Sequence, residues 1–171
     1  KDTGHVIINQ TNNILQFQKN LKGDPTVVIP KVYLEYTTPQ VLVMEALNGT
    51  PMSQLEKLRG QGVHPELIVK RGMRLFFRMV FQDKFFHGDL HAGNLFVMPG
   101  DKIGLIDFGV VGRLSDKVRD SIADMFVSLA QQDYERLAHV YVEMSPYNET
   151  TDVDQFARDL RDLIAPYFGL S

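Results

Sequence analysis

The sequence predicts an α+β fold in which one helix and three short strands come first and helices make up most of the rest. Runs of β-branched and aromatic residues are confined to residues 26–44, whereas apolar residues recur at helical spacing in most segments after residue 51. With 171 residues, 44% of them hydrophobic, the chain is long enough to bury one core. We therefore expect a single domain over residues 1–171.

The first 47 residues combine the helix with the three strands. Ile14, Phe17 and Leu21 follow one another at steps of three and four residues, which predicts a helix over residues 6–21. The strands are predicted at residues 26–29, 32–36 and 41–44.

Helices dominate the remaining sequence. A short polar helix is expected within residues 51–62, and residues 65–84 carry the strongest helical pattern, about 30 Å long at the rise of an α-helix. Ser115 has the residue type of an N-cap and predicts the start of the next helix. A further helix follows residues 132–137, and the last is expected from about residue 152 to residue 165.

Residues 87–109 contain the pattern that points most directly to a function. His-Gly-Asp-Leu-His-Ala-Gly-Asn occupies residues 87–94, and an apolar run then leads into Asp-Phe-Gly at residues 107–109. This is the order of a kinase catalytic loop followed by the metal-binding turn. Asp-Phe-Gly alone would be weak evidence, but the two motifs together are specific.

The chemistry of phosphoryl transfer explains the residue types. One carboxylate must lie near the acceptor hydroxyl, and Asp89 is suited to this role. Hard oxygen ligands must hold magnesium, and we assign Asn94 and Asp107 to it. Gly93 and Gly109 are expected to let the backbone turn sharply beside these ligands.

Two histidines and one aromatic residue are predicted to support the loop. We expect His87 to have a structural role near the Asp-Phe-Gly turn that contains Phe108, and for His91 both a structural and a functional role are open. His87, Asp89 and His91 alternate, so a metal hydrolase is a further candidate, but no other cluster of ligands accompanies them.

The two motifs resemble those of the UbiB family, also called AarF-type atypical kinases. The similar segments are Phe-Phe-His-Gly-Asp-Leu-His-Ala-Gly-Asn at residues 85–94 and Ile-Gly-Leu-Ile-Asp-Phe-Gly-Val-Val-Gly-Arg-Leu at residues 103–114, with Ala92 where the family usually has Pro. Members are protein-kinase-like ATPases associated with ubiquinone and other prenyl-lipid metabolism. The resemblance implies a protein-kinase-like fold, here a mostly helical C-lobe with a few N-lobe strands at its start.

The resemblance also implies a binding site for ATP and Mg²⁺. Residues 44–49 resemble the hinge of a kinase, so the backbone of Glu45, Ala46 and Leu47 would contact adenine. Residues 1–47 would then be a remnant of the N-lobe with the hinge, and residues 48–171 the C-lobe. The sequence contains neither a Gly-rich phosphate loop nor a lysine on a strand before the first helix. We therefore expect a partial domain that is inactive by itself.

Residue 10 departs from the family pattern. The helix over residues 6–21 resembles a family helix whose Glu pairs with the N-lobe lysine; Asn13 and Phe17 match that pattern, but Gln10 replaces the Glu. A neutral amide cannot form the ion pair, which keeps a nucleotide-binding pseudokinase as an alternative. A small-molecule phosphotransferase of the aminoglycoside or choline kinase type is a second alternative, although its acidic residues after the metal-binding Asp are missing here.

Composition narrows the class of partner. The net charge of −3, the pI near 5.9 and the lack of a Lys/Arg run give no footprint for nucleic acid. The absence of cysteine excludes disulfides, and no apolar run approaches the ~20 residues of a transmembrane helix. We expect a cytoplasmic location, with any peripheral membrane association carried by segments outside this chain. The expected partners are a nucleotide and, from the resemblance, a prenyl-lipid precursor or lipid-biosynthesis proteins.

Overall fold

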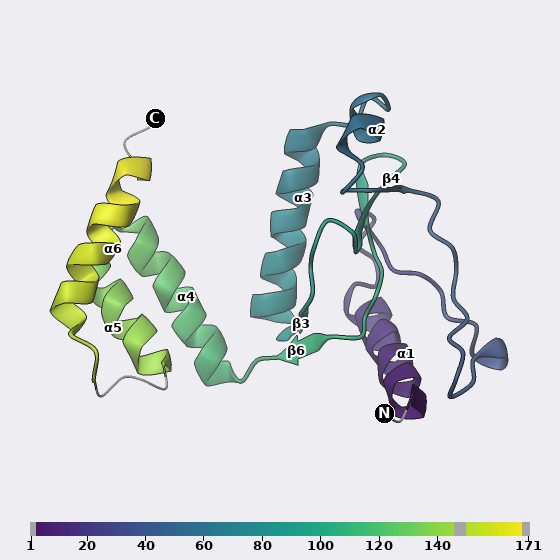
Figure 1. The fold of residues 1–171 in the computed structure, drawn as a ribbon, viewed down its shortest axis with the longest axis horizontal. Coiled ribbons are helices and arrows are strands. Elements are labelled where there is room, and N and C mark those ends of the chain that lie inside the picture. Colours follow the sequence, from purple (N-terminus) through teal and green to yellow (C-terminus); the bar gives the residue numbers. More distant parts are fainter. Residues whose placement is uncertain (1–2, 146–149, 169–171) are drawn as a thin grey trace. The chain divides into compact units, whose positions relative to one another are not determined.

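A computed structural model of the chain describes residues 3–145 and 150–168. The chain divides into two compact units, Lys1–Arg113 and Leu114–Ser171 (Figure 1). The first unit contains both the catalytic-loop and the metal-turn motifs. Each unit is therefore described by itself, and the candidate site belongs to the first.

Helix α1, Thr3–Asn20, confirms the helix predicted at the start of the chain. Ile14 and Phe17 are almost completely buried, and Leu21 follows them directly after the helix. Gly23 has a φ of 84°, a left-handed conformation that glycine adopts without steric cost and that commonly ends helices. The apolar face of α1 is thus turned into the core of the first unit.

Two small sheets position the motifs. The first has the strand order β1-β5-β4-β2, with bounds Val27–Val28, Lys102–Leu105, Leu95–Met98 and Thr50–Pro51. Strand β1 runs parallel to β5, and the other neighbours are antiparallel. The second sheet pairs β3, Phe85–His87, with β6, Val111–Arg113. The chain between the motifs therefore folds as the β4–β5 hairpin.

Two of the three predicted early strands are wrong. Residues 32–36 and 41–44 form only isolated bridges, Val32 with Met44 and Thr38 with Val41, and residues 34–36 fold into the 3₁₀ turn η1, Leu34–Tyr36. The Thr37 hydroxyl donates to the Tyr33 carbonyl at 3.0 Å and accepts from the Val43 N–H at 3.2 Å. A side chain that takes up these backbone groups competes with a continuous strand ladder.

The helices before the catalytic loop agree with the prediction. Helix α2 is Leu55–Arg59, and α3 is Pro65–Phe77 with Pro65 in its first turn. The helix continues as the π-helical turn η2, Arg78–Gln82. Leu75 and Met79 are buried, and α3 packs beside β5. The long helix leads the chain directly to β3 and the catalytic loop.

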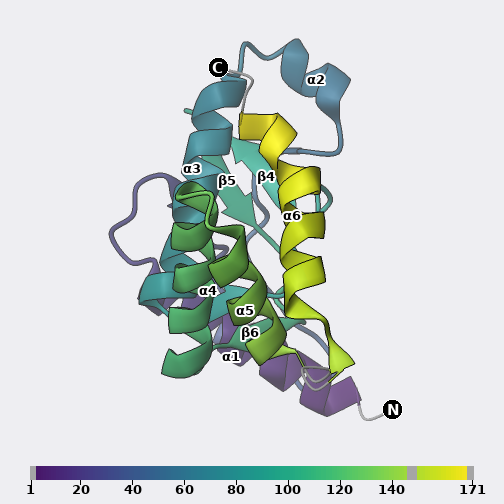
Figure 2. The same cartoon turned by 90° about the vertical axis from the view of Figure 1, so that its left-hand side faces the viewer.

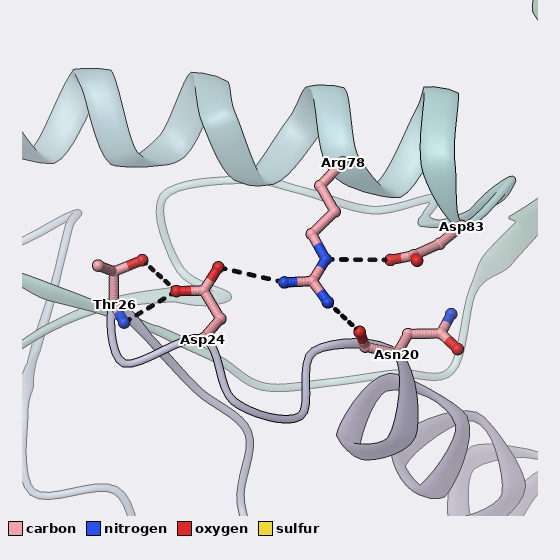
Figure 3. A network of polar contacts seen from close by, with 5 residues as sticks. All are labelled: Asn20, Asp24, Thr26, Arg78 and Asp83. Atoms are coloured by element: carbon pink, nitrogen blue, oxygen red, sulfur yellow. Dashed lines mark hydrogen bonds and ion pairs between the residues drawn. The ribbon is translucent and has the colours of Figure 1, made fainter.

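A polar network fixes η2 to the end of α1 (Figure 3). The Arg78 guanidinium donates to the Asn20 carbonyl and to Asp24 Oδ2, the latter at 3.4 Å, and its Nε lies 3.8 Å from Asp83 Oδ2. Asp24 Oδ1 accepts from the Thr26 N–H at 3.0 Å and from its hydroxyl at 2.6 Å. Arg78 therefore neutralises two carboxylates and satisfies a carbonyl at the C-terminal end of α1.

The second unit consists of helices α4, α5 and α6, which are Asp116–Ala130, Tyr134–Met144 and Val153–Phe168. Helix α5 contacts both α4 and α6, and Figure 2 shows α5 and α6 side by side. Ser115 is the N-cap of α4, as predicted, because its Oγ accepts from the Val118 N–H. Across the described residues, every helix is too short or too polar to traverse a bilayer.

Candidate active site

His87 connects the catalytic loop to the strand that precedes Asp-Phe-Gly. Its side chain is buried, its Nδ1 accepts from the Asp89 N–H at 3.2 Å, and its Nε2 lies 3.0 Å from the Ile106 carbonyl. Since Nδ1 is the acceptor, the ring carries its proton on Nε2 and donates it to Ile106. Both ring nitrogens are thus engaged by the backbone, which argues against the metal-hydrolase alternative that needs His87 as a ligand.

Asp89 has a fixed backbone and an accessible carboxylate. Its N–H is bound by His87, and its carbonyl accepts from Asn94 Nδ2 at 3.1 Å. The side chain is 53% exposed. Such a carboxylate is held in place by its own backbone yet remains open to a substrate hydroxyl.

His91 lies in the same loop but is bound more loosely. Its Nδ1 accepts from the Gly93 N–H at 3.0 Å, and its Nε2 is 3.9 Å from Asp89 Oδ2. The second distance exceeds that of a hydrogen bond. The ring is exposed, so its geometry leaves both of the predicted roles open.

Asn94 is the point at which the two motifs join. The residue is buried, with its N–H donating to the His91 carbonyl at 2.9 Å and its carbonyl accepting from the Ile106 N–H at 3.1 Å. Its side-chain nitrogen is bound to the Asp89 carbonyl. The side-chain oxygen Oδ1 is the acceptor of the amide and is therefore the atom that can bind a cation.

Asp107 adopts an unusual backbone conformation. Its φ is 57°, in the left-handed region that residues with a Cβ rarely occupy. Its Oδ1 accepts from the Gly109 N–H at 3.3 Å, which leaves Oδ2 for another partner. The next side chain, Phe108, is fully buried, with its ring 5.2 Å from that of Phe17 and 5.5 Å from that of His87.

The hairpin brings Asn94 and Asp107 to the same end. Leu95 pairs with Leu105, and the Ile106 N–H donates to the Asn94 carbonyl, so the residues that flank β4 and β5 are neighbours. An amide oxygen and a carboxylate are hard ligands that suit Mg²⁺, which in nucleotide sites takes its other ligands from phosphates and water. The donor set fits the magnesium ion that the sequence implies.

Gly93 and Gly109 both lie in turns, as predicted. Neither has a positive φ, and the left-handed residue at the metal-binding turn is Asp107. A Cβ on Gly93 would lie 2.8 Å from the His91 ring, and one on Gly109 would lie 3.3 Å from Asp107 Oδ1. A side chain at Gly93 would require the exposed His91 ring to move, and one at Gly109 would require Asp107 Oδ1 to shift slightly.

The predicted hinge lies beside β5. Glu45 is tied to Lys31, because its N–H donates to the Lys31 carbonyl at 2.7 Å and its Oε2 accepts from the Lys31 N–H at 3.1 Å. Ala46 is exposed and Leu47 half-buried. Leu47 packs against Gly104 of β5, where a Cβ would lie 2.9 Å from its Cδ1. The segment thus adjoins the strand that ends at Asp107.

Asn13 matches the family helix pattern, but the sequence by itself assigned it no function. Its Nδ2 donates to the Phe108 carbonyl at 2.8 Å. Gln10, half-buried, precedes it by three residues on the same face of α1. The helical spacing of Gln10, Asn13 and Phe17 could be seen in the sequence. The hydrogen-bond partner of Asn13 could not, because it lies 95 positions away.

Comparisons with known proteins agree with the two motifs. A family model described as the ABC1 atypical kinase-like domain matches residues 8–141. The "Probable protein kinase UbiB" of Pasteurella multocida is 37% identical over 162 residues, which are 92% of this chain and 31% of that protein. The protein of the same name from Cronobacter sakazakii is 34% identical over 167 residues, 95% of this chain and 30% of that protein. The chain therefore spans about a third of the length of the curated relatives it matches.

A solved structure shares the fold. Rv3197 of Mycobacterium tuberculosis, determined in complex with erythromycin, matches with a TM-score of 0.67 and 22% sequence identity over 93% of this chain and 40% of that protein. The predicted α+β, kinase-like fold is confirmed. Since the family model covers most of the chain and both relatives carry the UbiB name, this chain belongs to the family of ABC1 atypical kinase-like domains.

Proposed function

We propose that the chain carries the catalytic loop and metal-binding turn of an ATP-dependent phosphoryl-transfer enzyme or ATPase of the UbiB type. The supporting observation is the pair of hydrogen bonds made by Asn94. Its Nδ2 donates to the Asp89 carbonyl, and its own carbonyl accepts from the residue before Asp107, each at 3.1 Å. The three residues that this chemistry needs are thereby linked in one hydrogen-bonded unit.

Each residue has a distinct task in this proposal. Asp89 orients the acceptor hydroxyl or takes its proton, because its carboxylate is accessible on a fixed backbone. Asn94 Oδ1 and Asp107 would hold magnesium. The metal ion would neutralise the charge of the phosphates, and ATP would provide the phosphoryl group. His87 keeps Asp89 in register with the strand end at Ile106.

The adenine contact is proposed at the segment Glu45 to Leu47. The Glu45 N–H is already used by the Lys31 carbonyl, so a base would have to be recognised by the backbone of Ala46 and Leu47 or by the Glu45 carbonyl. Leu47, which packs on β5, would offer an apolar contact to the base.

The rest of the active enzyme is proposed to lie outside this segment. Residues 1–47 would be a remnant of the N-lobe with the hinge, and residues 48–171 the C-lobe. The curated relatives are about three times as long as their match to this chain, which leaves room for a phosphate loop and a phosphate-binding lysine. From the family resemblance we propose a prenyl-lipid precursor as the acceptor, with water as the acceptor in a pure ATPase.

The test is magnesium-dependent ATP binding and hydrolysis by the full-length protein. Asp107→Asn should weaken magnesium-dependent nucleotide binding and abolish turnover, because an amide cannot replace the anionic ligand. Asp89→Asn should retain binding and lose turnover. Asp162→Asn, the same chemical change at an exposed position of α6, should behave like the unmodified protein.

The unmodified protein separates the remaining alternatives. Binding of ATP without turnover would favour the pseudokinase, for which Gln10 is the supporting feature. A complete lack of nucleotide binding would contradict the proposed function. Turnover by the unmodified protein would make Gln10 a tolerated variation.

A further inference from the structure

A polar side chain of helix α1 binds the backbone of the metal-binding turn. Asn13 Nδ2 donates to the Phe108 carbonyl at 2.8 Å. A carbonyl oxygen can only accept a hydrogen bond, so the Asn13 amide must bind it through the NH₂ group. The bond fixes the peptide group between Phe108 and Gly109.

The same face of α1 also holds the Phe108 side chain. Phe17 lies four residues after Asn13, and its ring is 5.2 Å from the Phe108 ring. Both rings are buried. Helix α1 thus contacts Phe108 at two places, its carbonyl and its ring, and these contacts involve side chains of different chemistry.

The turn needs such contacts because its conformation is unfavourable. Asp107 has a φ of 57°, a left-handed conformation that costs free energy for a residue with a Cβ, although less for Asp than for most. The Asp107 carboxylate itself accepts one weak hydrogen bond, from the Gly109 N–H at 3.3 Å. Without Asn13 the Phe108 carbonyl would lose its hydrogen-bond donor, and the peptide between Phe108 and Gly109 could rotate. The Asp107 carboxylate would change direction with it, because it binds the Gly109 N–H of the same peptide.

Helix α1 is itself anchored at its other end. Arg78 donates to the Asn20 carbonyl and is paired with Asp24 (Figure 3). A helix fixed at this end and attached to Phe108 through Asn13 can transmit its position to the turn.

We propose that Asn13 is a positioning residue that orients the Asp107 carboxylate toward magnesium, so that the placement of α1 sets the metal affinity of the site. This inference rests on the proposed function, since it assigns magnesium to Asp107. Asn13 acts through Phe108 and would touch neither metal nor substrate.

The experiment compares Asn13→Ala and Asn13→Asp with Asn12→Ala and Asn12→Asp in the full-length protein. Both Asn13 variants remove the N–H donor, while Asp additionally turns a charge toward the Phe108 carbonyl. Asn12 is the exposed neighbour on α1, so the same changes there control for helix propensity and charge. The measurements are the magnesium concentration for half-maximal ATP turnover, the turnover at saturating magnesium, and amide hydrogen exchange over residues 107–110.

Loss of one hydrogen bond should raise the half-maximal magnesium concentration by about tenfold in both Asn13 variants. Turnover at saturating magnesium should change much less, and exchange over residues 107–110 should accelerate, with neither effect in the Asn12 variants. An unchanged magnesium requirement would overturn the inference, even if exchange accelerates, because Asn13 would then only stabilise the fold. Opposite effects of Ala and Asp would also overturn it, since charge alone would explain them.

A failure of the proposed function can be distinguished from a failure of the inference about Asn13. It would appear in the unmodified protein as a lack of magnesium-dependent nucleotide binding, before any Asn13 variant is compared. In that case the inference falls with the proposal on which it rests.

Discussion

At the residue scale, the polar side chains of the catalytic loop bond mainly to the backbone. His87 binds the Asp89 N–H and the Ile106 carbonyl, and Asn94 binds the Asp89 carbonyl. These bonds leave the carboxylates of Asp89 and Asp107 exposed. The loop is therefore ordered by neutral side chains, and its charged groups remain available for a ligand.

His87→Ala tests this arrangement. It should reduce the free energy of unfolding by about 1–3 kcal/mol, because the Asp89 N–H and the Ile106 carbonyl lose their partner beside the buried Phe108. Turnover should fall by up to about a hundredfold, since the Asp89 backbone is no longer fixed. Urea denaturation and the ATPase rate measure the two effects.

His91→Ala is the control for His87, because it removes an exposed histidine from the same loop. Its effect on the free energy of unfolding should stay within about 0.5 kcal/mol. Equal losses of stability in the two variants would contradict the bridging role of His87.

At this scale, the sequence was sufficient to nominate Asp89, Asn94 and Asp107, since their spacing follows the order of a kinase catalytic loop and Asp-Phe-Gly. It could not assign the bond of Asn13, whose partner is distant in the chain. It also did not reveal that Asp107 has a positive φ, because glycine is the usual residue in that conformation.

At the element scale, Arg78 connects η2 to the C-terminal end of α1. The side chains of the Arg78–Asp24 pair are 26% and 6% exposed, so this contact is shielded from solvent far more than a surface ion pair. Arg78→Met should lower the free energy of unfolding by about 3 kcal/mol, because it removes the cation that is paired with both Asp24 and Asp83. Arg78→Lys should give an intermediate loss, since an ammonium group keeps the charge without the planar fork.

Arg59→Met provides the matched control in α2. Arg59 pairs with Glu56 at 2.8 Å, but the two side chains are 75% and 86% exposed. Its loss should cost less than about 0.5 kcal/mol. Chemical denaturation of the three variants measures these differences, and a cost for Arg78→Met as small as that for Arg59→Met would show that the network contributes little.

The elements differed in how well periodicity predicted them. Helices α1, α3 and α4 followed from apolar spacing and from end signals such as Pro65 and Ser115. The strands expected at residues 32–36 and 41–44 did not form, because the Thr37 side chain binds backbone groups that a ladder would use. Such competition depends on which segments meet, and propensity alone does not contain it.

At the scale of the whole molecule, two carboxylates that share Arg78 should have opposite effects on stability. Burial raises the pKa of Asp24, but the hydrogen bonds from Thr26 and the charges of Arg74 and Arg78 outweigh it, so the pKa lies below its ordinary value. Burial raises the pKa of Asp83, and Arg78 only partly opposes this. The fold thus favours the ionised form of Asp24 and disfavours the ionised form of Asp83.

The signs follow from linkage. Asp24 stabilises the fold above about pH 4, where the unfolded chain is ionised, and this contribution is lost as the pH falls through its lowered pKa. For Asp83 the contribution is present below about pH 4 and is lost as the pH rises through its raised pKa. At neutral pH the Asp83 charge therefore opposes folding.

Asp24→Asn and Asp83→Asn make the same chemical change on either side of Arg78. At pH 7, Asp24→Asn should destabilise the protein, and Asp83→Asn should leave its stability unchanged or increase it. Both differences from the unmodified protein should shrink toward pH 3. Urea denaturation across this pH range measures them, and a loss of stability at pH 7 in both variants would contradict the assigned signs.

By itself, the sequence determined the family, the helical character of most of the chain and the residues to which phosphoryl-transfer chemistry is assigned in the proposed function. These properties depend on local spacing and on residue types that the chemistry requires. Only the tertiary structure decided how α1 contributes to the site and why Asp107 adopts a left-handed backbone. The contacts of Asn13 and Phe17 with Phe108 join segments about 90 residues apart, and such pairings arise from packing of the whole first unit rather than from any local pattern.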